Sequence, residues 1–174
     1  MNFFENYLQS VTSEFLRYKT LGEKVFEQLS DEEILWKQNN SDNSIAIIIK
    51  HLSGNLLSRW TDFLTEDGEK PWRNRDIEFK EPPATKDELL TIWAKGWECL
   101  FNALDSITVA NLNTRVAIRN EAHTPIEAIN RQLAHYANHI GQIIILGKML
   151  KGEDWITLSV PKGGSEAFNR RMRT

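Results

Sequence analysis

Residues 124–150 read TPIEAINRQLAHYANHIGQIIILGKML, and this stretch decides the fold. Thr124 is a suitable N-cap, Pro125 suits the first helical position, and Glu127 stands where a capping-box acid belongs. Gly152 follows as a stop signal. Apolar side chains recur with a helical period between these signals, at Leu133, Tyr136, Ile140, Ile143, Ile144 and Gly147. The sequence therefore predicts one long amphipathic helix.

Two histidines of this helix, His135 and His139, are four residues apart. That spacing puts both imidazoles on one side of a helix, one turn apart, where they can hold one divalent cation. They lie at the border of the apolar side, beside Gln132 and Gln142, where a helix turns from the core toward a groove. A histidine pair on a solvated face would carry no function. This stretch alone therefore does not decide between a metal-binding pair and a solvent-exposed pair without function.

The composition favours one domain, residues 1–174, with a sizeable core. A hydrophobic content of 41% argues against disorder, and the net charge of -3 argues against general nucleic-acid affinity. The sequence has no run of 18 apolar residues and no signal-peptide pattern at its start. With one cysteine, these features favour a cytoplasmic protein. Cys99 is most simply a core residue, with a nucleophile as the alternative.

Amphipathic periodicity predicts three further long helices, at residues 2–29, 44–65 and 85–106, and a short helical turn after Ser30. Residues 66–84 form a long connection interrupted by prolines, and residues 107–123 an extended connector or short strand. The segment after the long helix looks extended and irregular. The expected fold is all-α: a four-helix bundle with long connections and an irregular C-terminal tail.

A third histidine, His51, lies inside the predicted helix at residues 44–65, on the face of Ile47, Ile48 and Asn55. A buried imidazole needs a polar partner, because leaving it unpaired costs roughly 1–3 kcal/mol. A backbone carbonyl or Asn55 is the simple partner. The functional alternative is an ion shared with the two histidines of the long helix.

Three imidazoles would leave open positions on such an ion, as catalytic sites do. Gln142 and Asn55 are candidates for orienting the rings. His123 immediately precedes the long helix and is expected to be a capping or loop histidine rather than a ligand.

Two groups of basic residues lie outside the predicted helices. The long connection contains Arg73 and Arg75 next to Trp72, and the C-terminal end is basic because of Lys162, Arg170, Arg171 and Arg173. The simple expectation is that Trp72 packs on the core as a lid, that the arginines are solvated and that the tail folds back on the bundle. The alternative is that these residues border a ligand pocket or reach an anionic ligand.

Four segments together resemble the DinB-like superfamily over nearly the whole chain: IIIKHLSGNLLSRWTDFL (47–64), EKPWRNRDIEF (69–79), AINRQLAHYANHIGQIIILGK (128–148) and TLSVPKGGSEAFN (157–169). The resemblance is to a branch of bacterial proteins with no settled activity. It implies a four-helix bundle, often a homodimer, with one divalent metal ion, usually zinc or nickel, held by three histidines that match His51, His135 and His139. Relatives include bacillithiol S-transferases, mycothiol-dependent maleylpyruvate isomerases and metal-dependent hydrolases.

Three functions remain open at this stage. The first is a metal-dependent transferase of a small thiol, with Arg73, Arg75 or the basic end holding its carboxylates. The second is a hydrolase, for which no general base can be named because Glu121 and Glu127 lie too far along the helix axis. The third is a non-catalytic, metal-stabilised helical dimer; six tryptophans and much aliphatic surface favour a dimer in any case.

Overall fold

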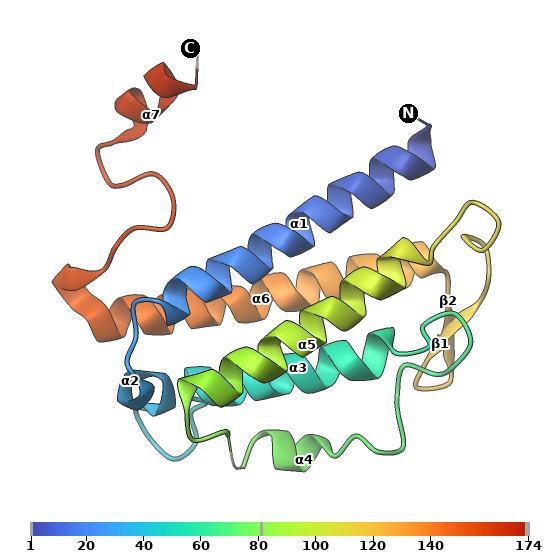
Figure 1. Cartoon of the computed structure of the whole chain (residues 1–174), viewed down its shortest axis with the longest axis horizontal. Coiled ribbons are helices and arrows are strands. Elements are labelled where there is room, and N and C mark those ends of the chain that lie inside the picture. The colour runs from blue at the N-terminus through green and yellow to red at the C-terminus, as the bar shows by residue number, and fades with distance from the viewer. Residues whose placement is uncertain (1, 81, 173–174) are drawn as a thin grey trace.

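The computed structural model describes residues 2–80 and 82–172 and shows four long helices lying side by side (Figure 1). These are α1 (Phe3–Phe26), α3 (Ile45–Trp60), α5 (Lys86–Asp105) and α6 (Pro125–Lys151). Helix α3 packs against α5 and α6, and α1 packs against α6 and α5. The predicted all-α four-helix bundle is confirmed.

The ends of the long helices follow from their capping residues. Thr124 and Glu127 form the predicted capping box of α6, and Gly152 ends that helix with a positive φ of 54°. Thr85 caps α5 in the same way, and Ser44 caps α3. Helix α3 ends at Trp60 rather than near residue 65, because Asp62 adopts a positive φ of 49° that an α-helix does not allow.

Shorter elements occupy the connections. They are α2 (Asp31–Leu35), α4 (Arg75–Glu78), strands β1 (Val116–Ile118) and β2 (Glu121–His123), a 3-10 turn η1 (Gly152–Asp154) and α7 (Ser165–Arg171). The strands pair as an antiparallel hairpin, so residues 116–118 are extended as expected, but β2 and the helix α4 were not predicted. The tail also contains α7, which stands apart from the bundle in Figure 1.

A buried hydrogen-bond chain fixes α3 against α6 in the middle of the bundle. The indole N–H of Trp60 donates to the hydroxyl of Tyr136 over 2.9 Å, and that hydroxyl donates to Asn55 Oδ1 over 3.0 Å. Tyr136 is fully buried and also packs on Phe15 and Trp97. Because Tyr136 directly follows His135, this chain sets the position of the histidines of α6 relative to α3.

A search of the helices in the described part of the chain finds none with the length and apolarity needed to span a membrane.

Candidate metal centre

The structure brings His51 of α3 together with His135 and His139 of α6. One ligand atom from each ring lies within 4.8 Å of the others, and the ring centroids are 4.6–5.5 Å apart. Three nitrogens bound to one tetrahedral ion lie roughly 3.4 Å apart, given metal–nitrogen bonds of about 2.0–2.1 Å. Small side-chain rotations that move the ligand atoms by about an ångström would bring them to this spacing, so this group could hold a metal ion.

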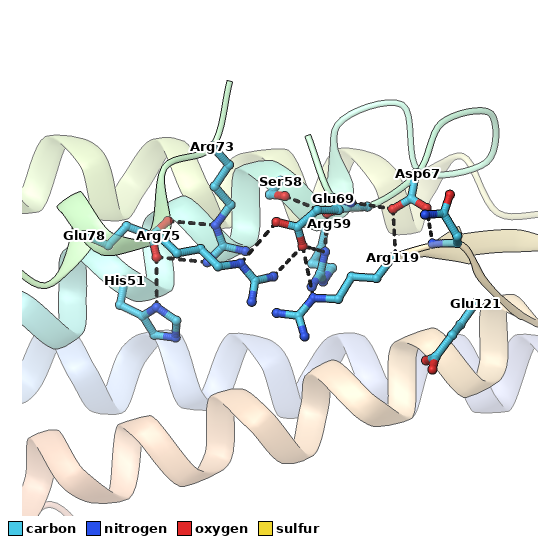
Figure 2. A network of polar contacts seen from close by, with 12 residues as sticks. His51, Ser58, Arg59, Asp67, Glu69, Arg73, Arg75, Glu78, Arg119 and Glu121 are labelled. Carbon is cyan, nitrogen blue, oxygen red and sulfur yellow. Dashed lines mark hydrogen bonds and ion pairs between the residues drawn. The ribbon is translucent and has the colours of Figure 1, made fainter. Parts of the chain in front are cut away.

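A carboxylate that the sequence did not reveal orients His51. Glu78, at the end of α4, accepts a hydrogen bond from His51 Nδ1 over 3.0 Å, and Arg73 binds both oxygens of the same carboxylate over 2.7 and 3.0 Å. Figure 2 shows this His51–Glu78–Arg73 chain. A proton on Nδ1 leaves the Nε2 lone pair of His51 available for an ion, which is the usual carboxylate–histidine–metal arrangement.

Helix α4 reaches this position through contacts with α3. The side chain of Lys50 donates to the carbonyl oxygen of Ile77 over 2.7 Å, and Asn74 caps the first turn of α4. Gly54 faces the Glu78 carboxylate so closely that any Cβ at this position would overlap it. The absence of a side chain at Gly54 therefore lets the carboxylate reach His51.

The two histidines of α6 complete the donor set. Gln142 Oε1 lies 3.0 Å from His139 Nδ1, so the predicted orienting role of Gln142 is confirmed and Nε2 of His139 is left as the lone-pair nitrogen. The Nε2 atom of His135 is buried and has no hydrogen-bond partner among the described residues. A buried polar atom without a partner calls for a ligand, and a cation fits a neutral imidazole nitrogen.

The surroundings favour the neutral form of His135 and His139 and the ionised form of Glu78. Burial, and then the neighbouring His139 and His51 rings, lower the pKa of His135 to about 4. Burial also lowers the pKa of His139, against the effect of its hydrogen bond to Gln142, which raises it. Burial alone would raise the pKa of Glu78, but hydrogen bonds from His51 and Arg73 and the charge of Arg73 hold it below its usual range. Neutral imidazoles are the form that binds metal.

Without metal, the protein is expected to lose stability as the pH falls from about 6.5 toward about 4. The unfolded chain protonates His135 near its ordinary pKa of 6.5, whereas the folded chain resists protonation until about pH 4. At about 1.4 kcal/mol per pH unit, His135 alone accounts for about 2 kcal/mol between pH 6.5 and pH 5. Urea unfolding of the chelator-treated protein at several pH values measures this slope. A His135→Ala variant with an unchanged slope would contradict the assignment.

A family model described as "Protein of unknown function (DUF1572)" matches residues 2–164. The chain belongs to the DUF1572 family. This family is DinB-like, so the predicted membership of the DinB-like superfamily is confirmed. The family description gives no activity, and kinship with thiol transferases stays a prediction. A comparison of the DUF1572 chain with curated proteins returns no match.

Three other residues considered in the sequence analysis lie outside the cluster. Asn55 accepts from Tyr136 and not from a histidine, so its predicted orienting role is wrong. Cys99 is half-buried against the core and lies 3.5 Å from the hydroxyl of Thr61, in a groove that none of the three histidines lines. His123 lies on β2, outside the cluster, and not in a cap, since Thr124 is the N-cap of α6.

The basic residues of the long connection also differ from expectation. Trp72 is 58% exposed and therefore does not pack as a lid, whereas the side chain of Arg73 is only 2% exposed because it is paired with Glu78. In the tail, Lys162 lines a groove between α1, α6 and the tail, and Arg170 pairs with Glu166. Arg173 lies outside the described residues. Among the basic candidates of the sequence, Arg75 is the one that faces a cavity beside the histidines.

Proposed function

We propose that this DUF1572 protein is a metal-dependent enzyme that binds a small thiol at the three-histidine cluster and transfers it to an electrophilic carbon. His51, His135 and His139 would be the ligands, with zinc or nickel as the ion. The observation that supports this most is the matched donor set: two Nδ1 atoms are already engaged by Glu78 and Gln142, and the third ring has a buried Nε2 with no partner among the described residues.

The chemistry follows from the charge of the donor set. A divalent ion held by three neutral imidazoles keeps its full charge and open coordination positions, which would lower the pKa of a bound thiol. The protein's part is to hold the rings, through Glu78 and Arg73 on one side and Gln142 on the other. The ring of Phe79 packs beside that of His51, with the ring centroids 5.0 Å apart. The thiol would release its proton to solvent, and its sulfur would then bond to the electrophilic carbon while the leaving group departs with the bonding electron pair.

A hydrolase is less well supported, because no carboxylate of the described residues is placed as a general base. Glu121 is 72% exposed and lies near Arg131 and His123, while Glu127 is bound to the backbone at the start of α6. Glu78 is already bound to Arg73 and His51. Within the described residues, these contacts leave a hydrolase dependent on metal-activated water alone.

Metal-loaded protein should conjugate a small thiol to a chromogenic electrophile, with bacillithiol, glutathione and coenzyme A as the donors tested. His139→Ala should reduce the rate to the uncatalysed level, because it removes a ligand. Cys99→Ala is the matched control and should keep the rate, since Cys99 lies away from the histidines.

The outcomes separate the three functions. Conjugation that His139→Ala leaves intact refutes the transferase. Metal-dependent cleavage in an ester and amide panel would favour the hydrolase instead. A melting temperature that falls sharply on chelation, together with no turnover and a dimeric mass in light scattering, would favour the non-catalytic homodimer.

A further inference from the structure

Four arginines from four separate segments line one cavity beside the histidine cluster. Arg59 comes from α3, Arg75 from α4, Arg119 from the hairpin turn and Arg131 from α6. The cavity measures about 430 Å³, and His135 forms part of its wall. No acidic side chain is among the described residues that line it. In Figure 2, Arg59, Arg75 and Arg119 extend toward one another.

The positive charge here exceeds the negative charge available to balance it. Glu69 is shared by three of the arginines: its carboxylate lies 2.5 Å from Arg75, 3.2 Å from Arg119 and 3.6 Å from Arg59. Among the described residues, Glu121 is the ion-pair partner of Arg131, and it is 72% exposed and 3.8 Å away. In a chain whose net charge is -3, four guanidinium groups of the described part thus form ion pairs with two carboxylates, and Asp67, which interacts electrostatically with Arg59, is a third acid nearby. Such a local excess of positive charge attracts anions.

Two buried polar atoms in this wall lack hydrogen-bond partners among the described residues. One is Nε of Arg59, a residue that is 5% exposed and whose Nη1 contacts Gly68 and Glu69. The other is the side-chain oxygen of Gln132, a residue that is 4% exposed. Polar atoms buried in this way are uncommon in folded proteins and point to an ordered water or an ion nearby.

The position of Arg119 is fixed in advance by a distant loop. Arg119 and Asn120 form the two-residue turn between β1 and β2 with φ of 56° and 62°. Asp67 accepts hydrogen bonds from both of their backbone N–H groups, over 2.9 and 2.7 Å. A two-residue hairpin turn of this type requires positive φ at both central positions, which strains residues other than glycine. Here the strained turn places a guanidinium at the rim of the cavity.

We propose that this arginine cavity binds the carboxylate or phosphate group of the substrate and so presents the substrate's reacting atom to the histidine cluster. Guanidinium groups bind both kinds of oxyanion in pairs of hydrogen bonds. The cavity volume suits a small molecule. The shared wall at His135 joins the two sites. The role in presenting a reacting atom rests on the proposed function, whereas anion binding itself does not.

Titration calorimetry of the metal-loaded protein tests this directly, with succinate as the carboxylate probe and inorganic phosphate as the phosphate probe. Arg119→Gln and Arg131→Gln should each weaken binding of the preferred anion about ten-fold, since each removes a charged hydrogen-bond donor. Both side chains are about half exposed, so these variants should fold, and a melting curve checks this. Arg17→Gln, on the exposed side of α1, makes the same charge change and should have no effect.

Binding of neither probe at millimolar concentration would overturn the inference, as would equal affinity in the Arg119→Gln/Arg131→Gln double variant. Affinity that disappears with His139→Ala but is unchanged by the arginine variants would also overturn it, because the anion would then be bound at the histidines. Elemental analysis of the same samples separates the two proposals. Protein that takes up no metal on loading but still binds an anion through the arginines refutes the metal site, and metal-loaded protein that binds no anion refutes the cavity.

Discussion

His135→Ala should abolish metal binding, leaving the purified protein nearly free of zinc and nickel. The free energy of zinc binding in four-ligand protein sites is about 10–16 kcal/mol, so losing one ligand should cost roughly 3 kcal/mol or more, or at least about 100-fold in affinity. His135 is the sharpest choice because its Nε2 is buried without a partner, which gives this ring no structural hydrogen bond to lose at that atom. Elemental analysis after dialysis against equimolar metal measures the effect.

His123→Ala is the matched control for this experiment. It makes the same chemical change on β2, outside the cluster, and should leave metal content unchanged. Chelation should lower the melting temperature of the wild type and of His123→Ala but not that of His135→Ala, since a ligand stabilises only the state that binds it. Equal metal content in all three proteins would show that the histidines are not the site.

The long helices could be predicted because their signals are local. In α6, the capping residues, the proline at the first turn, the apolar period and the closing glycine all lie within one stretch of sequence. The same information places His135 and His139 on one side of the helix. His51 could be connected to them only by assuming that α3 and α6 are neighbours, which the family resemblance and the polar position of His51 on a buried face both favoured.

Glu78 could not be found in this way. It lies 27 residues from His51 and reaches it through a four-residue helix, which is too short to show a period. Nothing local separates Glu78 from the rest of the 24 Asp and Glu residues in the chain. The one sequence feature that points to Glu78 is the pair of arginines, Arg73 and Arg75, in a proline-interrupted loop. Arg73 is buried by its contact with the Glu78 carboxylate, and a buried arginine needs an acidic partner.

The arginine cavity depends even more on tertiary structure. Its four arginines lie in four segments, and no spacing rule connects them. The hairpin turn that carries Arg119 lacks the glycine that usually marks such turns, because Asp67 stabilises the strained backbone from a loop about 50 residues away. A turn stabilised by a distant side chain gives no local signal, which is why β2 was also missed.

Glu78→Ala is expected to be the most destabilising single change near the site. It would leave Arg73, whose side chain is 2% exposed, as a buried charge without its carboxylate, and would take the acceptor from His51 Nδ1. Breaking one side of a buried ion pair costs about 3–5 kcal/mol. Urea unfolding measures this loss. Glu14→Ala removes an exposed carboxylate paired with Arg17 on α1 and should change stability by less than about 0.5 kcal/mol.

Glu78→Gln separates the two roles of the carboxylate, because its amide oxygen can still accept from His51 while the negative charge is lost. We expect metal affinity to fall about 10–100-fold, as for other residues that orient a metal-binding histidine. Adding Arg73→Met to Glu78→Gln should restore part of the lost stability, since no buried charge then remains unpaired, but it should not restore metal affinity. If the double variant recovers both, the carboxylate serves only to neutralise Arg73, and His51 does not depend on it for its orientation.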